Sequence, residues 1–311
     1  MKLIRGLINL PASERGSVVT IGAFDGLHRG HMALIDRTRA VAARLARPAM
    51  MITFEPMPRA FLAPEDPPAR LTDLRERWHI LQESGLRALC VLRFDADLRS
   101  MTGERFIELL ARDFAVSAVI VGHDFRFGRG GATSAAVLEL AGREYGFSVE
   151  IVPPVLCGAT RVSSSEIRGA LERGDFTTAT RLLGRPYTMR GRVVQGERLG
   201  RQLGYPTANL RMNRPRAPLR GIFAVRVRGV SGAGADDAMN GVASLGTRPT
   251  VGGVEPLLEV HIFDYAGDLY GRQLEVEFVA KLRDEAHFAS LELLVAQMHA
   301  DATAARRILC A

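Results

Sequence analysis

The sequence is poor in cysteine and lysine and has no long apolar run. It contains no stretch of about eighteen consecutive apolar residues, and its N-terminus lacks the pattern of a cleavable secretory signal. The three cysteines, Cys90, Cys157 and Cys310, lie far apart in the chain, so neither a disulfide framework nor a zinc site is predicted. These absences predict a cytoplasmic protein without membrane contact.

Lys2 and Lys281 are the only lysines, so arginine carries nearly all of the positive charge. Arginine does not deprotonate in the working pH range, which argues against Schiff-base chemistry. The sequence contains no GxxxxGK[ST] motif, so nucleotide phosphates would have to be bound by arginine, histidine, backbone N–H groups and metal. The formal charge of +7 suits polyanionic small substrates. It would also suit an RNA-binding barrel, but clustered basic residues and stacking aromatics are missing, so we expect no nucleic-acid partner.

The 311 residues are enough for two domains of ordinary size. In the first half, apolar strand patterns alternate with helical patterns, which predicts a doubly wound α/β domain on a parallel sheet. The strands are expected at residues 18–24, 50–54, 88–94, 117–125 and 147–152, and the helices at 32–46, 71–84, 103–114 and 136–146.

Two short helices are expected next, over residues 164–173 and 177–183, and the pattern changes at residues 184–186. Strands then follow one another with turn residues between them, which predicts a small antiparallel barrel or sandwich closed by a C-terminal helix over residues 290–309. We therefore place the domain boundary between residues 184 and 185. The later strands are expected at residues 188–196, 221–229, 240–246, 257–265 and 273–282.

A histidine-containing turn, residues 25–31, follows the first predicted strand, with a helix expected to begin near His31. A helix N-terminus at this point of a parallel sheet is an anion site. His28 and His31 are three residues apart, so on one helical turn both imidazoles would reach the same phosphate group. They could instead be ordinary polar residues at a helix start, but the strand–turn–helix context favours function.

Other segments carry weaker signals. Ser164, Ser165 and Arg168 open a helix, a pattern that suits either a plain N-cap or a second phosphate clamp. The stretches 53–58 and 121–128 follow predicted strands, at the sheet edge where ligands bind, although their phenylalanines could equally be core residues.

The second half contains a glycine-punctuated loop, Gly196–Gly204, that could wrap phosphates with its N–H groups. Thr207 and Asn209 follow it and offer oxygen ligands that suit Mg²⁺, although Pro-Thr and Asn also form turns. Glu259 shares one strand face with His261, and is either a solvated charge or a general base that faces a ligand. We expect His261 and Asp264 to be structural.

The chain resembles the prokaryotic bifunctional riboflavin kinase/FAD synthetase family over nearly its full length. The resemblance rests on motifs in the order of that family: FDGxHxGH, TFEPxP, GxDFRFG, SSSxIR, GRxLGxPTAN, GTRPT and ExHxFDxxxDLYG. It implies an N-terminal, Rossmann-like HxGH nucleotidyltransferase domain that converts FMN to FAD with release of pyrophosphate. It also implies a C-terminal β-barrel riboflavin kinase. Both reactions use ATP and a divalent metal, normally Mg²⁺, with riboflavin and FMN as the other small-molecule partners.

Site residues follow from the same resemblance. His28 and His31 are implied to be catalytic in adenylyl transfer, and Glu259 in phosphorylation. The implied ATP-binding residues are Gly22, Phe24, Gly30, Ser164, Ser165, Arg168, Gly200, Gly204 and Thr207. The implied flavin-binding residues are Phe54, Pro56, Pro58, Asp124 and Phe125, and the implied metal ligands are Thr207 and Asn209. Met57 stands where the family more often has histidine.

One alternative is a monofunctional HxGH adenylyltransferase with a β-barrel binding module. It would leave Thr207, Asn209 and Glu259 without a role. The sequence is also compatible with a homo-oligomer.

Overall fold

The computed structural model describes residues 1–196, 200, 203–230, 238–250 and 253–310, with only the backbone at residues 248–250 and 253–255. Contacts divide the chain into two compact units. Unit 1 contains Met1–Pro68 and Leu74–Ser163, and unit 2 contains Ala69–Asp73 and Ser164–Ala311. In the described part of the chain, no helix has the length and apolar character needed to span a membrane.

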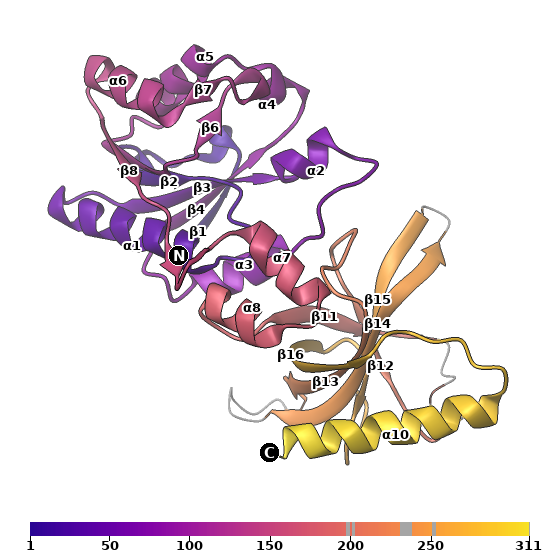
Figure 1. The fold of residues 1–311 in the computed structure, drawn as a ribbon. Helices are drawn as coiled ribbons and strands as arrows, with labels where there is room; N and C mark the ends of the chain where they lie inside the picture. The colour runs from indigo at the N-terminus through magenta and orange to yellow at the C-terminus, as the bar shows by residue number, and fades with distance from the viewer. Residues whose placement is uncertain (197–199, 201–202, 231–237, 251–252, 311) are drawn as a thin grey trace. The chain divides into compact units, whose positions relative to one another are not determined.

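Unit 1 is built on a six-stranded parallel sheet with the strand order β1-β4-β3-β2-β5-β8 (Figure 1). Helices connect the strands because parallel neighbours require crossover connections. The strands are β1 (Lys2–Arg5), β2 (Val18–Ile21), β3 (Ala49–Glu55), β4 (Ala88–Arg93), β5 (Ala118–Gly122) and β8 (Ser148–Val152). The α-helices are α1 (Arg29–Arg44), α2 (Pro58–Leu62), α3 (Leu74–Leu81), α4 (Ala96–Ser100), α5 (Gly103–Glu108) and α6 (Ala135–Tyr145).

Side chains on the two faces of this sheet enter two separate cores. Along β3, Met50 and Ile52 belong to one core, and Met51 between them belongs to the other. The first core also takes residues of α5 and α6, and the second takes residues of α1 and α3. Helices therefore cover both faces, which confirms the predicted doubly wound α/β fold and explains why the central strands β2, β3, β4 and β5 are mostly buried.

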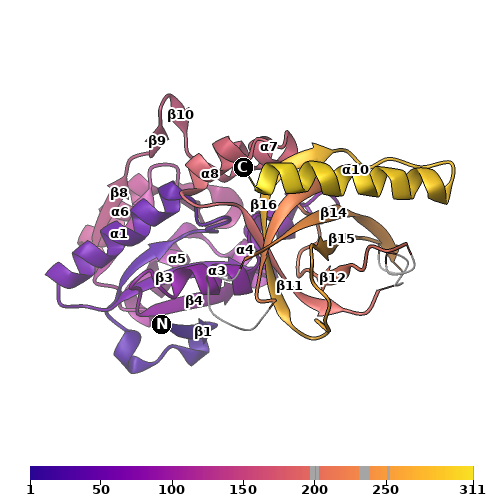
Figure 2. The same cartoon turned by 90° about the horizontal axis from the view of Figure 1, so that it is seen from below.

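Unit 2 is a closed antiparallel barrel with the strand order β11-β12-β15-β14-β13-β16, so the sandwich alternative was wrong. The strands are β11 (Thr188–Val194), β12 (Ala208–Arg211), β13 (Gly221–Arg228), β14 (Met239–Thr250), β15 (Gly253–Ile262) and β16 (Gln273–Arg283). The C-terminal helix α10 (Leu291–Leu309) lies along the outside of the barrel (Figures 1 and 2). Its Ala305 and Leu309 form a small apolar core with Ala224 and Phe263.

Two short helices, α7 (Ser164–Glu172) and α8 (Phe176–Leu183), belong to unit 2 by their contacts. The ring of Phe176 packs against the rings of Phe223 and Phe278, which lie in the barrel strands. The division by contacts therefore falls between Ser163 and Ser164, whereas the sequence pattern predicts a boundary between residues 184 and 185. The predicted boundary stays a proposal about the two functional domains.

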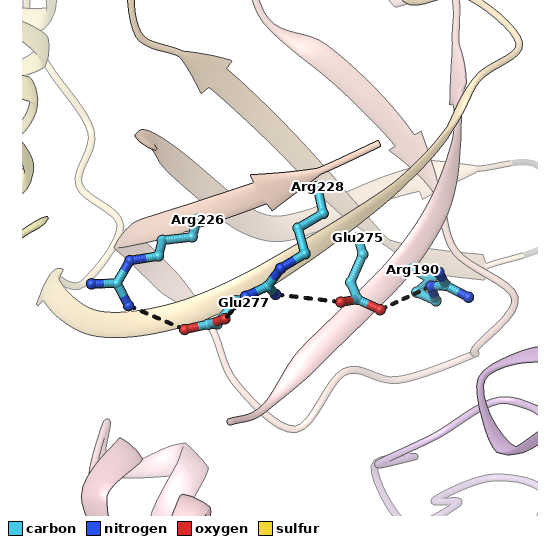
Figure 3. Close-up of polar contacts among 5 residues, drawn as sticks. All are labelled: Arg190, Arg226, Arg228, Glu275 and Glu277. Carbon is cyan, nitrogen blue, oxygen red and sulfur yellow. Dashed lines mark hydrogen bonds and ion pairs between the residues drawn. The ribbon is translucent and has the colours of Figure 1, made fainter. Parts of the chain in front are cut away.

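A ladder of charged residues crosses three neighbouring barrel strands (Figure 3). Glu277 on β16 accepts hydrogen bonds from Arg226 at 3.3 Å and Arg228 at 2.9 Å, both on β13. Glu275 pairs with Arg228 at 3.5 Å and with Arg190 of β11 at 3.0 Å. Cross-strand charge pairs contribute about 0.2–1 kcal/mol each, so the ladder helps to hold these strands in register.

Among the strands of the six-stranded sheet and the barrel, sequence patterns missed two, β1 and β12. In β1, only one of four residues is buried, so the apolar signal is too weak to indicate a strand. β12 begins inside the segment that we interpreted as metal ligands or a turn. The helix expected to begin near His31 begins at Arg29, because His28 is its N-cap. The region predicted as one helix over residues 103–114 is α5 followed by a π-helical turn, Leu109–Asp113.

Candidate functional site

The predicted residues of unit 1 gather at the carboxyl ends of three adjacent strands. β2 pairs with β3 on one side and with β5 on the other, and the chain order of the sheet reverses between β2 and β5. Ligands of open α/β sheets bind at such a reversal point. After β2, His28 caps α1 and His31 lies in its first turn. Phe54 lies at the end of β3, Pro56 follows it and Pro58 begins α2, while Asp124 and Phe125 lie in the turn after β5.

His28 and His31 stack on each other at the start of α1. Their ring centroids are 3.5 Å apart with an interplanar angle of 16°. Nδ1 of His28 accepts a hydrogen bond from the backbone N–H of His31 at 3.3 Å, so His28 caps the helix. The His31 ring also meets the ring of Phe24 edge to face at 5.2 Å. Both imidazoles therefore lie beside the positive end of the helix dipole, where an anion is favoured.

Glycines allow close packing in this turn. A methyl group at Gly30 would approach the His28 ring to 3.2 Å, and one at Gly22 would approach the Phe24 ring to 3.3 Å. Phe24 and Leu27 adopt positive φ angles of 51° and 42° while both are buried. Left-handed backbone at non-glycine residues costs free energy and is concentrated at functional turns.

Arg77 of α3 is a residue of this region that sequence reasoning missed. It is 1% exposed, and its guanidinium donates to the carbonyl of Ala23 at 2.9 Å and to the hydroxyl of Thr53 at 2.9 Å. It also pairs with Glu55 at 2.8 Å. One buried cation therefore joins the turn after β2 to the end of β3. Sequence gave no signal for this role, because Arg77 lies among other charged residues of an amphipathic helix.

The predicted flavin residues differ in exposure. Phe54 is buried and packs edge to face on Phe94, so core packing accounts for it. Pro56 is exposed, and Pro58 is the first residue of α2. The intervening Met57 is buried, which fits a packing role for this departure from the family pattern.

The turn after β5 has a different character. Asp124 is exposed and accepts a hydrogen bond from Arg161 at 2.5 Å. Phe125 is half-buried, and its ring stacks on that of Phe127 at 5.5 Å. Phe127 itself is buried and belongs to the core.

The remaining predicted residues belong to unit 2. Ser164 and Ser165 are the first residues of α7, where they present a helix N-terminus. Arg168, one turn later, donates from Nε to the carbonyl of Ala69 at 2.6 Å, so at least one of its hydrogen bonds is structural. Their role as a phosphate clamp stays a prediction.

In the barrel, Asn209 of β12 lies directly opposite Glu259 of β15, and Ser244 of β14 lies opposite Glu259 on its other side. Directly opposed residues place their Cβ atoms about 4.5–5.5 Å apart on the same face of the sheet. Thr207 precedes Asn209 by two residues and Asn209 is buried. Neighbouring Leu210 and Leu258 are buried on the other face, so the predicted alternation in β15 is confirmed. Asn209 and Glu259 therefore share the face of the barrel wall opposite to Leu210 and Leu258, and Thr207 directly precedes β12.

Two glycines of the preceding loop lie against these residues. A methyl group at Gly196 would collide with the Asn209 side chain, and one at Gly200 would collide with the carbonyl of Tyr205 and approach the Thr207 hydroxyl to 3.3 Å. Gly204 has a φ of +84° that favours glycine. The predicted phosphate loop is only partly described, because residues 197–199 and 201–202 lie outside the described residues, as do the side chains of residues 248–250 in the GTRPT motif.

Two protein-family models match the chain in succession. The FAD synthetase family matches residues 10–166, and the riboflavin kinase family matches residues 183–309. The barrel therefore belongs to a kinase family, and the alternative of a barrel that is only a binding module was wrong.

Similar proteins cover nearly the whole chain. The bifunctional riboflavin kinase/FMN adenylyltransferase of Escherichia coli (strain K12) is 43% identical over 308 residues, which are 98% of this chain and 97% of the relative. The Pseudomonas fluorescens protein of the same name is 45% identical over 310 residues, 99% of this chain and 98% of the relative. A solved structure described as a macrolide-efflux protein from Streptococcus pneumoniae aligns with a TM-score of 0.80 at 32% identity, over 97% of each chain.

Proposed function

Because the chain belongs to the bifunctional riboflavin kinase/FMN adenylyltransferase family, we propose how its residues divide two consecutive reactions. The enzyme phosphorylates riboflavin to FMN and adenylylates FMN to FAD, with ATP as the co-substrate of both steps. We assign adenylyl transfer to residues 1–184 and phosphorylation to residues 185–311. The ranges of the two family models, 10–166 and 183–309, support this assignment.

For adenylyl transfer, the stacked histidine pair carries the proposal. The FMN phosphate attacks the α-phosphorus of ATP, and pyrophosphate leaves. His28 and His31 stabilise the negative charge that develops on the phosphoryl oxygens, because their rings lie together at the N-terminus of α1. Gly22, Phe24 and Gly30 shape the nucleotide side of this turn. The other proposed contacts to ATP phosphates are Ser164, Ser165 and Arg168.

For the flavin of this reaction, we propose contacts from the ends of β3 and β5. Asp124 and Phe125 follow β5 and are exposed and half-buried, so they can meet a ligand directly. Pro56 and Pro58 flank a rigid turn after β3. Phe54 is buried, so we propose that it contributes indirectly, by packing in the core next to that turn.

For phosphorylation, the opposition of Asn209 and Glu259 carries the proposal. Glu259 removes the proton of the riboflavin 5'-hydroxyl as that oxygen attacks the γ-phosphorus of ATP, and ADP leaves. Thr207 and Asn209 supply a hydroxyl and an amide oxygen, the hard donors that Mg²⁺ prefers, and Gly196 leaves space beside Asn209. The donor set thus fits Mg²⁺, which when bound would offset the charge of the phosphates. Gly200 and Gly204 let the loop backbone approach those phosphates.

The purified protein incubated with riboflavin, ATP and MgCl₂ tests the whole scheme. Separation of the flavins over time should show FMN that rises and then falls while FAD accumulates. When FMN is supplied in place of riboflavin, FAD should form without a lag. An enzyme that forms FAD from FMN but never phosphorylates riboflavin would contradict the kinase assignment.

Fragments test the proposed boundary. A fragment of residues 185–311 should phosphorylate riboflavin, and a fragment of residues 164–311 should do so with higher thermal stability. The longer fragment retains Phe176, whose ring packs on Phe223 and Phe278. A folded 164–311 fragment without kinase activity would contradict the assignment of phosphorylation to this domain.

We also propose a cytoplasmic protein without a nucleic-acid or membrane partner. Its three cysteines are free thiols, which suits a reducing compartment. Co-sedimentation with RNA and with anionic vesicles, and size-exclusion chromatography for the oligomeric state, would test these points.

A further inference from the structure

Tyr205 lies in the chain between the glycine loop and the proposed metal ligands. Its side chain packs against helix α10. It is 9% exposed, and its hydroxyl lies 2.5 Å from Nδ1 of His299 on α10. The two rings meet edge to face with centroids 5.2 Å apart. The backbone N–H of Tyr205 donates to the carbonyl of Gly200 at 2.7 Å. A single residue thus connects the C-terminal helix to the loop that leads into Thr207.

His261 holds Pro206, the residue after Tyr205. It lies on β15 two positions after Glu259 and shares its face. Its ring meets the Tyr205 ring edge to face at 4.9 Å, and its Nδ1–H donates to the carbonyl of Pro206 at 2.9 Å. The strand that carries the proposed base therefore also binds the segment that carries the proposed metal ligands.

Helix α10 has a separate attachment to the barrel. Arg306 forms two hydrogen bonds to Asp264, at 2.7 and 2.9 Å, and its guanidinium lies over the Phe263 ring at 4.2 Å. The hydrogen bonds from Arg306 lower the pKa of Asp264. Ala305 and Leu309 also pack in the apolar core with Ala224. The helix is thus held in place without His299, so docking of α10 does not by itself account for the Tyr205–His299 contact.

We propose that Tyr205, His261 and His299 are positioning residues of the kinase reaction. His299 fixes the Tyr205 side chain and His261 fixes the Pro206 carbonyl, and this clamp keeps Thr207 and Asn209 facing Glu259. The proposal rests on the proposed roles of Thr207, Asn209 and Glu259. The three residues do not touch the reacting atoms. They restrict the chain just before the metal ligands. The conformational entropy of that segment is therefore lost on folding and not when the substrates bind.

Conservative variants of the full-length enzyme test this clamp. Tyr205→Phe removes one hydroxyl and keeps the ring, and His299→Leu removes the partner nitrogen. Each should lower kcat for riboflavin phosphorylation by about two- to tenfold, the range expected for one hydrogen bond. Each should also raise the Mg²⁺ concentration for half-maximal rate, with the KM for riboflavin unchanged. His299→Asn places an amide near the position of Nδ1 and should restore most of the rate.

Two controls separate positioning from stability. Arg306 lies on the same helix as His299, and Arg306→Gln breaks its pair with Asp264. This variant should have a lower melting temperature, while its kcat stays at the parental value. FMN adenylylation, measured in every variant with supplied FMN, should be unchanged.

Glu259→Gln is measured in parallel. If Glu259→Gln is inactive as a kinase while Tyr205→Phe and His299→Leu keep parental kcat and Mg²⁺ dependence, the clamp is refuted and the proposed base stands. If Glu259→Gln phosphorylates riboflavin at the parental rate, the assignment of the base has failed. The Mg²⁺ dependence of the Tyr205 and His299 variants then still decides whether the clamp acts on the metal ligands. A loss of rate that follows melting temperature across all variants, Arg306→Gln included, would show a merely structural role and overturn the clamp.

Discussion

Asn209 and Glu259 face each other directly across two antiparallel strands of the barrel. The pairing brings an amide oxygen, suited to a metal ion, next to a carboxylate, suited to accept a proton. Fifty residues of sequence separate them, so the antiparallel register of β12 and β15 is what makes them neighbours. The proposed kinase chemistry depends on this pairing.

Replacement of Glu259 by Gln should lower riboflavin phosphorylation by about two to four orders of magnitude. Glutamine keeps the shape of the side chain but cannot accept the hydroxyl proton. The variant should still convert supplied FMN to FAD, and Glu292→Gln, at an exposed position of α10, provides a control substitution. Near-parental phosphorylation by a folded Glu259→Gln enzyme would remove Glu259 from the mechanism.

Replacement of His31 by Ala should lower adenylyl transfer by about a hundredfold or more, since a charge-stabilising group is lost from the transition state. Flavin binding and riboflavin phosphorylation should persist. The measurement is FAD formation from FMN at saturating ATP. Parental FAD formation would return His31 to a packing role beside Phe24.

His28 allows its capping role to be separated from its chemical role. Asparagine is a good N-cap, so His28→Asn should keep the hydrogen bond to the N–H of His31 and hence the stability of α1. It lacks an imidazole, so adenylyl transfer should still fall by about a hundredfold. Thermal melting and FAD formation measured together distinguish the two roles. Full activity of His28→Asn would mean that His28 serves only as a cap.

A methyl group at Gly196 should impair phosphorylation alone. It would collide with the Asn209 side chain, so Gly196→Ala should displace a proposed metal ligand. We expect at least a tenfold lower kinase rate and a higher Mg²⁺ requirement, with FMN adenylylation in the same protein as the internal control. A Mg²⁺ titration identical to that of the parent enzyme would show that Asn209 does not bind the metal.

The charge ladder of the barrel should contribute to stability and not to chemistry. The Glu277 side chain is 8% exposed and pairs with Arg226 and Arg228, which are about one-third exposed or more, so Glu277→Ala removes two cross-strand charge pairs. At about 0.2–1 kcal/mol for each pair, we expect a loss of about 0.4–2 kcal/mol in the free energy of unfolding of the barrel. Far-UV circular dichroism is the better probe, because the only tryptophan, Trp78, belongs to unit 1. An unchanged unfolding transition would show that the ladder contributes nothing measurable.

Local sequence patterns were sufficient for much of this protein. Buried parallel strands are apolar on both faces, and helices repeat with their own period, so the alternation in the first half predicted the doubly wound fold. The histidine turn was recognisable because its function depends on residues close together in sequence, after a strand and before a helix. The same reasoning explains why β1 was missed: a strand with one buried residue leaves little pattern to detect.

Tertiary structure decided everything that depends on residues far apart in the chain. A strand pattern does not specify its partners, so a barrel was predicted but only the folded chain showed its strand order, with Glu259 between Asn209 and Ser244. Arg77 and Tyr205 were likewise inaccessible to sequence reasoning. A buried arginine or a tyrosine–histidine contact has no periodicity, and its meaning comes from the partners that folding brings within hydrogen-bonding distance.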